Sequence, residues 1–349
     1  MISKKMLSIT AIFAFIVLLF SYFTLTSNKN SNPVAIDSLC SDTPNKSLDQ
    51  CYKDYILKVA DKSGYLKAIE VLEQDKKDPN LAKLCHLAAH SLGKYALENA
   101  SSVNEAITLG GLSCSNGYYH GILELAGSKL STTEFVSTIN IFCSVLEDEP
   151  VNHMDCAHGI GHAAYINSNF DLHNSTILCG NLDTSLDRLM CISGVFMQWG
   201  IDYRGGLILP RDPTTLRDFC LIESPQYPSE YKTACLQNIL LALTINDFQK
   251  DYSFEDFRVW CDKLPTKDSP DCYYGIGYAA NGLVDFNSTI LTNDVCGSSD
   301  SPSNQKCIHR MSQGYGAVLG DKKMLADICY QLPPAQQPYC LNVKKYELR

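Results

Sequence analysis

The sequence lacks the short patterns that most directly identify a function. It contains no Walker loop, no Rossmann fingerprint and no Gly-x-Ser-x-Gly nucleophile elbow, so the usual signatures of nucleotide binding and serine hydrolysis are missing. No block of like charge and no basic stripe occurs along the chain, whose formal net charge is -9. Because nucleic-acid binding needs clustered Lys and Arg to neutralise phosphates, we expect no nucleic-acid partner.

Long hydrophobic runs are also scarce, with a single one at residues 6–25 that contains no charged side chain. A membrane-spanning helix needs about 20 such residues. Lys4 and Lys5 precede the run, and the positive-inside rule then keeps residues 1–5 in the cytoplasm and sends the remainder outside. A cleaved signal peptide is the alternative. Its apolar region is usually shorter, about 7–15 residues, and is followed by a small-residue cleavage site, which residues 26–32 do not offer.

The Cys-x-x-Cys motif is absent, although the chain contains 16 cysteines, an even number. A cytosolic protein with so many cysteines usually shows metal-binding spacings of this kind, so their absence indicates disulfides and an oxidising compartment. Together with the signal-anchor at residues 6–25, this predicts a polar linker at residues 26–39 and an extracytoplasmic domain at residues 40–349. We expect a single-pass membrane protein with its bulk at a cell surface or in a periplasm.

The cysteines form pairs separated by similar short gaps. These pairs are Cys40/Cys51, Cys143/Cys156, Cys179/Cys191, Cys220/Cys235, Cys261/Cys272, Cys296/Cys307 and Cys329/Cys340. Cys85 and Cys114 remain and pair by elimination. From Cys143 onward, the first cysteines recur at steps within the range of about 20–50 residues that is typical of stacked-repeat architectures.

Each unit between cysteine pairs reads as a helix, a short polar loop and a second helix. The letters Asn-Ser-Thr-Ile-Leu open a first helix at residues 174–178 and recur at residues 287–291, and polar loops are expected at residues 147–155 and 265–271. Two antiparallel helices approach closely at their connecting loop, where a disulfide can meet its required Cα separation of about 4.4–6.8 Å. The expected fold is therefore all-α, an α-solenoid of disulfide-stapled helical hairpins.

A glycine follows the second cysteine by three residues in several of these units, at Gly117, Gly159, Gly194 and Gly275. A glycine inside a helix costs about 1 kcal/mol relative to alanine, so its recurrence indicates a compensating gain. Close packing between neighbouring helices is one such gain, and backbone access for a ligand is the other. The unit length and hairpin form resemble tetratricopeptide and Sel1-like repeats in general form, although the tetratricopeptide Trp-Leu-Gly pattern is missing.

Histidines gather in one part of the chain. Of the 8 histidines, those within residues 86–162 are His86, His90, His120, His153, His158 and His162. Five of these, with Glu124, form pairs four residues apart: His86/His90, His120/Glu124 and His158/His162. Residues four apart share one helical face, so three adjacent helices bring these six side chains together as candidate metal ligands.

Imidazole ligands suit several transition metals, and iron or zinc are the first candidates. The layout resembles that of deoxyhypusine hydroxylase, a helical-repeat di-iron enzyme, in design only, because that enzyme's His-Glu pairs are adjacent in sequence. The zincin motif His-Glu-x-x-His is absent, which disfavours a metalloprotease. The alternative is that the histidines only pack and hydrogen-bond. Two functions therefore compete: a binding scaffold for a protein or glycan partner that also has a metal site, and a metal-dependent enzyme.

Overall fold

The computed structural model describes residues 46–75, 78–110, 114, 117–202, 220–221, 226–245, 253–283, 292–319, 326–327 and 329–341. The regular elements within these ranges are helices, with no strand among them, which confirms the all-α prediction. No helix in the described part of the chain is both long and apolar enough to cross a bilayer. The predicted anchor at residues 6–25 and linker at residues 26–39 lie outside the described residues.

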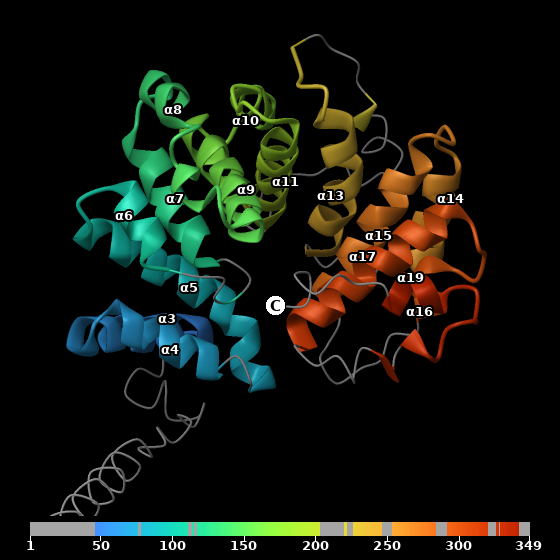
Figure 1. The fold of residues 1–349 in the computed structure, drawn as a ribbon, viewed down its shortest axis with the longest axis horizontal. Helices are drawn as coiled ribbons and strands as arrows, with labels where there is room; N and C mark the ends of the chain where they lie inside the picture. The colour runs from blue at the N-terminus through green and yellow to red at the C-terminus, as the bar shows by residue number, and fades with distance from the viewer. Residues whose placement is uncertain are drawn as a thin grey trace, which may run out of the picture. The chain divides into compact units, whose positions relative to one another are not determined.

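The centre of the fold is a series of long helices, each of which packs against the next in chain order (Figure 1). They are α5 (Pro79–Asn99), α7 (Gly117–Lys129), α9 (Pro150–Asn167), α11 (Ser185–Asp202), α13 (Tyr231–Ile245), α15 (Ser269–Leu283) and α17 (Pro302–Leu319). At the beginning of the described chain, α3 (Leu48–Ser63) and α4 (Tyr65–Asp75) pack against each other and against α5.

Short helices lie between the long ones. They are α6 (Val103–Thr108), α8 (Thr132–Thr138), the 3-10 helix η1 (Ser144–Leu146), α10 (Leu172–Cys179), α14 (Phe254–Asp262), α16 (Thr292–Cys296) and α19 (Gln337–Leu341). Several begin at a residue whose side chain caps the helix. Ser131 before α8 and Ser253 before α14 each form a capping box, with Glu134 and Asp256 respectively. Such reciprocal bonds satisfy backbone N–H groups that have no partner inside the helix.

Disulfides connect the helices in the pattern expected from the sequence. The bridges are Cys85–Cys114, Cys143–Cys156, Cys179–Cys191, Cys220–Cys235, Cys261–Cys272, Cys296–Cys307 and Cys329–Cys340, with Cα separations of 5.4 to 5.8 Å. These pairings confirm the predictions, including the one made by elimination. Cys51 is also disulfide-bonded, and its predicted partner Cys40 lies outside the described residues.

The predicted loops at residues 147–155 and 265–271 are only partly correct. The structure starts α9 at Pro150 and α15 at Ser269, so each long helix begins before its cysteine. Proline is favoured in the first turn of a helix because its missing N–H would have no intrahelical partner there. The polar residues preceding Cys156 and Cys272 therefore form the first turns of helices.

Glycines let the long helices approach one another closely. A Cβ atom at Gly121 in α7 would overlap the carbonyl of His90 in α5, and one at Gly194 in α11 would overlap the carbonyl of His158 in α9. A side chain at either position would push the two backbones apart. This confirms close packing as a role of the recurring glycines, and it brings the side chains on adjacent helices into contact.

Candidate metal centre

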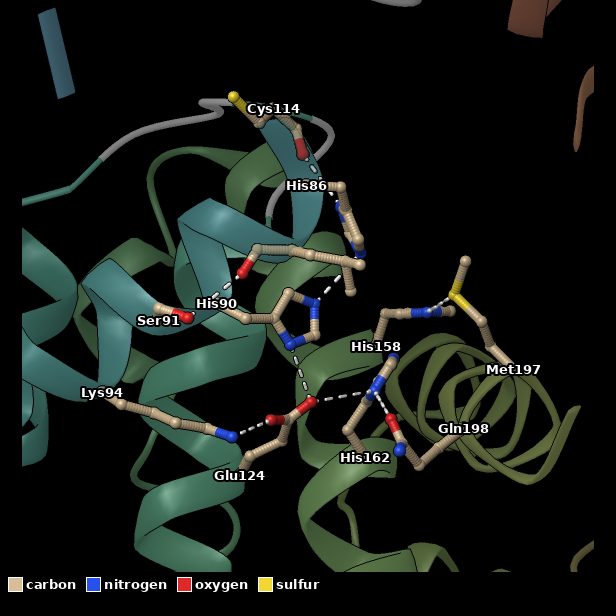
Figure 2. A network of polar contacts seen from close by, with 11 residues as sticks. His86, His90, Ser91, Lys94, Cys114, Glu124, His158, His162, Met197 and Gln198 are labelled. Carbon is tan, nitrogen blue, oxygen red and sulfur yellow. Dashed lines mark hydrogen bonds and ion pairs between the residues drawn. The ribbon is translucent and has the colours of Figure 1, made fainter. Parts of the chain in front are cut away.

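Three consecutive long helices supply the predicted site residues (Figure 2). Helix α5 carries His86 and His90, α7 carries His120 and Glu124, and α9 carries His158 and His162. Within each pair the side chains lie one helical turn apart on the same face. All of these side chains are buried except that of His86, which is partly buried.

The imidazole rings of the three helices meet at His120. Its ring centroid lies 5.3 Å from that of His86 and 5.2 Å from that of His90. On the other side, it lies 5.1 Å from the centroid of His158 and 4.4 Å from that of His162. The structure therefore brings together the five histidines singled out by the sequence.

These histidines form two possible groups of metal ligands. One group contains His86, His90 and His120, and the other contains His120, His158 and His162; within each, the candidate ligand atoms lie within 4.8 Å of one another. His120 belongs to both groups. Because a neutral imidazole offers one lone pair, His120 would bind one ion, and the geometry is compatible with a metal in either group.

Hydrogen bonds fix the protonation pattern of His86 and His90. The Nδ1 of His86 lies 2.9 Å from the backbone oxygen of Cys114, and the Nδ1 of His90 lies 2.9 Å from Glu124 Oε1. Both oxygens only accept, so each Nδ1 carries the proton of its neutral ring and each Nε2 carries a lone pair. The second nitrogens of both rings are therefore available as ligands, which is how metal-binding histidines are commonly held.

These two lone pairs face each other. The distance between His86 Nε2 and His90 Nε2 is 3.0 Å, although neither atom has a proton to donate in the neutral rings. Two nitrogens that bind one ion at a right angle, each at about 2.1 Å, are separated by about 3 Å. A cation between these atoms would turn a repulsive contact into an attractive one.

Two more ring nitrogens are buried without a hydrogen-bond partner. His162 donates through Nδ1 to Gln198 Oε1 at 2.6 Å, which leaves its Nε2 as the bare lone pair. Neither His162 Nε2 nor His120 Nδ1 has a partner within the described structure. Leaving a buried polar atom unpaired costs about 1–3 kcal/mol, so both atoms are candidates to bind a ligand.

Burial keeps the imidazoles of His86, His90, His120 and His158 neutral. It lowers the pKa of His86 to about 3, helped by the neighbouring His90, and it lowers the pKa values of His120 and His158 well below the usual histidine range. Burial also lowers the pKa of His90, against the opposing effect of Glu124. Because metals bind the neutral ring, these side chains are already in the protonation state that a metal requires.

Glu124 is the anionic group of the site. Burial by itself would raise its pKa, but hydrogen bonds from His162 and His90 outweigh burial and hold the pKa well below its usual range. Its Oε2 lies 2.8 Å from Lys94 Nζ, whose side chain is 46% exposed. The carboxylate is therefore ionised and neutralised by Lys94, and its contacts are those of a group that orients imidazoles. Its predicted role as a direct metal ligand stays a prediction.

Helix α11 adds two residues that the sequence interpretation did not include. Met197 Sδ lies 3.2 Å from His158 Nε2, and Gln198 accepts the hydrogen bond from His162. Met197 follows Cys191 by six residues, as His120 follows Cys114 and His162 follows Cys156. This shared position was the available signal in the sequence.

His153 lies in the same part of the sequence but outside the cluster. Its Nδ1 is 3.2 Å from the backbone oxygen of Cys143, and its Nε2 is 3.0 Å from Asp187 Oδ1. Both nitrogens thus have protein partners and neither is left to bind a ligand. His153 connects the start of α9 to α11 in a purely structural way.

Comparisons with known proteins identify no relative of this chain. The chain matches no family model, no curated protein and no solved structure. The function is therefore argued from the site alone.

Proposed function

We propose that this chain is an extracytoplasmic metal-binding protein whose ligands are the imidazoles of His86, His90, His120, His158 and His162. The observation that carries the proposal is the 3.0 Å contact between His86 Nε2 and His90 Nε2, two nitrogens whose protons are both placed elsewhere. The buried, partnerless nitrogens of His120 and His162 support it independently. Packing alone gives no reason to direct so many lone pairs at one another.

Glu124 acts in this proposal as a positioning residue. Its carboxylate accepts a hydrogen bond from the Nδ1–H of His90 and lies 3.5 Å from the Nδ1 of His162. Partners of this kind set the tautomer of a metal-binding histidine and raise its basicity. Lys94 balances the charge, so the site contains no uncompensated anion.

The location of the protein is part of the same proposal. The disulfides of the described helices are those of a protein in an oxidising compartment, and the hydrophobic run at residues 6–25 would anchor it to a membrane. The chain-order packing of the long helices supports an α-solenoid, a form that commonly presents a surface to a protein or glycan partner. The metal site would then be a feature of such a scaffold.

A metal-dependent enzyme is the second candidate, expected from the sequence with iron or zinc. Catalytic metal sites keep one position open for water or substrate. The grouping of the histidines in threes favours this candidate, because three protein ligands for one ion leave such a position.

Elemental analysis of purified full-length protein, reconstituted with iron, zinc or copper, tests the proposal. We expect stoichiometric metal in the unmodified chain and near-complete loss in His120→Ala, because His120 belongs to both ligand groups. The matched control is His153→Ala, which removes a partly buried histidine from α9 without touching the cluster. Absence of every metal from the unmodified protein would leave only the scaffold function.

A further inference from the structure

Met197 occupies a position in the cluster that corresponds to a histidine in the preceding helices. It projects from α11 toward His158, and its Sδ lies 3.2 Å from His158 Nε2 (Figure 2). The sulfur is thus as close to one imidazole nitrogen of the site as the nitrogens of His86 and His90 are to each other, within a few tenths of an ångström. Helix α11 is therefore the fourth helix that contributes a side chain to the centre.

Hydrogen bonding explains this contact poorly. A thioether sulfur is a weak acceptor, whereas the adjacent Gln198 has an amide oxygen that already accepts from His162 at 2.6 Å. A buried imidazole that needed only an acceptor would be better served by an oxygen. A thioether and an imidazole nitrogen directed at the same point are instead two electron-pair donors.

The chemistry of these donors selects among metals. Thioether sulfur is a soft ligand that selects cuprous copper, and imidazole binds copper as well as zinc or iron. Zinc and iron gain little from a thioether. A methionine at this position would therefore discriminate between metals that the histidines alone do not separate.

Charge favours the same ion. Glu124, the carboxylate that contacts the cluster in the described structure, is already balanced by Lys94 at 2.8 Å, and the thioether of Met197 carries no charge. A buried charge without a counter-charge is costly. A monovalent ion leaves half the uncompensated charge of a divalent one, so the donor set suits cuprous copper better than ferrous iron or zinc.

We propose that Met197 Sδ is a metal donor beside His158 and that it makes the centre selective for cuprous copper over zinc. This inference rests on the proposed metal-binding function and identifies the ion that the site prefers.

Copper(I) competition titration with a chromophoric chelator tests the inference on the full-length protein, alongside a zinc titration. Met197→Leu keeps the apolar volume and removes the sulfur. We expect it to weaken copper(I) binding by at least about tenfold, the scale reached even by partners one step removed from a metal, and to leave zinc binding unchanged. Met311→Leu, at a buried methionine in α17, is the matched control and should bind both metals as the unmodified chain does.

X-ray absorption at the copper edge gives a second measurement that does not depend on a variant. The unmodified protein loaded with copper(I) should show one sulfur neighbour in addition to nitrogen neighbours. Its absence, or unchanged copper(I) affinity in Met197→Leu, would overturn the assignment of Met197. Zinc binding by the unmodified chain separates the two proposals: if it persists while Met197→Leu changes nothing, only the copper inference fails, and if neither metal binds, the metal-binding function fails as well.

Discussion

Helices α5, α7 and α9 pack as closely as helices α13, α15 and α17, but the two groups differ chemically. In the first group a Cβ at Gly121 would overlap the carbonyl of His90, and in the second a Cβ at Gly277 would overlap the carbonyl of Cys307. Within the described residues, imidazoles converge only in the first group. In the second, the guanidinium of Arg310 lies 4.1 Å from the ring centroid of Tyr278. Close packing of these helices therefore does not require the histidines.

This comparison weakens the view that the histidines serve only packing. His153 shows what a structural histidine in this fold looks like, because both of its nitrogens have partners, the backbone oxygen of Cys143 and Asp187 Oδ1. His162, one helical turn beyond His158, has a partner on one side and a bare buried nitrogen on the other. These histidines all lie on α9. They therefore differ in the partners of their ring nitrogens and not in the helix that carries them.

Adding a methyl group at one closely packed glycine in each group should separate the two groups most strongly. Gly121→Ala and Gly277→Ala each force a Cβ onto a neighbouring backbone carbonyl, and overpacking of this kind typically costs about 1–3 kcal/mol. We expect both variants to unfold at lower denaturant concentration. Only Gly121→Ala should also lose metal, because it displaces the helix carrying His86 and His90. Equal metal loss in both variants would show that the centre depends on the whole helix array.

The buried histidines of the first group should make the stability of the metal-free protein depend on pH. His86, His90, His120 and His158 are neutral in the folded state because burial lowers their pKa values, that of His86 to about 3. In the unfolded chain they take up protons below about pH 6.5. The unfolded state therefore binds more protons between about pH 6.5 and 3, so the free energy of unfolding falls as pH decreases through this range. Burial raises the pKa of Tyr278 in the second group, and that residue contributes nothing here.

Denaturant titrations of the metal-free protein at pH 7 and pH 5 measure this dependence. His86→Asn with His158→Asn removes two of the buried imidazoles and should flatten the pH dependence, while Tyr278→Phe should leave it unchanged. A protein equally stable at both pH values would mean that these histidines are already charged or exposed when folded.

The sequence was sufficient to predict the helices, the disulfide pairs and the five converging histidines. Pairs such as His158/His162 are informative because a spacing of four residues fixes their common direction whatever the surrounding fold. The cysteine order similarly restricts the bridges, so that Cys85 and Cys114 were paired without any structural knowledge.

The remaining parts of the site could not be derived from spacing. The closeness of Met197 Sδ to His158 depends on how α11 packs against α9, where a Cβ at Gly194 would overlap the carbonyl of His158. The role of Glu124 in orienting imidazoles likewise depends on its ion pair with Lys94, which lies on α5 rather than on α7. A single sequence shows that residues share a position in successive helices, but not which atoms meet between them.

Two His–carboxylate pairs can be compared by replacing the carboxylate of each with its amide. One pair, His90–Glu124, lies in the candidate metal centre, and the other, His153–Asp187, lies outside it. Glu124 lies 2.9 Å from His90 Nδ1, and Asp187 lies 3.0 Å from His153 Nε2. We expect Glu124→Gln to lower metal affinity by about 10- to 100-fold, as for other partners of metal-binding histidines. Asp187→Asn should leave affinity unchanged while lowering the melting temperature. Calorimetric titration with zinc measures the first effect, and unchanged affinity in Glu124→Gln would contradict a positioning role.

The smallest expected effects come from the two capping boxes, where the regions should behave alike. The hydroxyl of Ser131 accepts from the backbone N–H of Glu134 at 3.3 Å, and the hydroxyl of Ser253 accepts from that of Asp256 at 3.2 Å. Replacing a serine cap by alanine typically costs about 1 kcal/mol. We expect Ser131→Ala and Ser253→Ala to lower the free energy of unfolding by similar amounts and to retain full metal content. If Ser131→Ala alone reduced metal content, α8 would have to be coupled to the imidazole cluster, and the separation between packing and metal binding would not hold for the first group of helices.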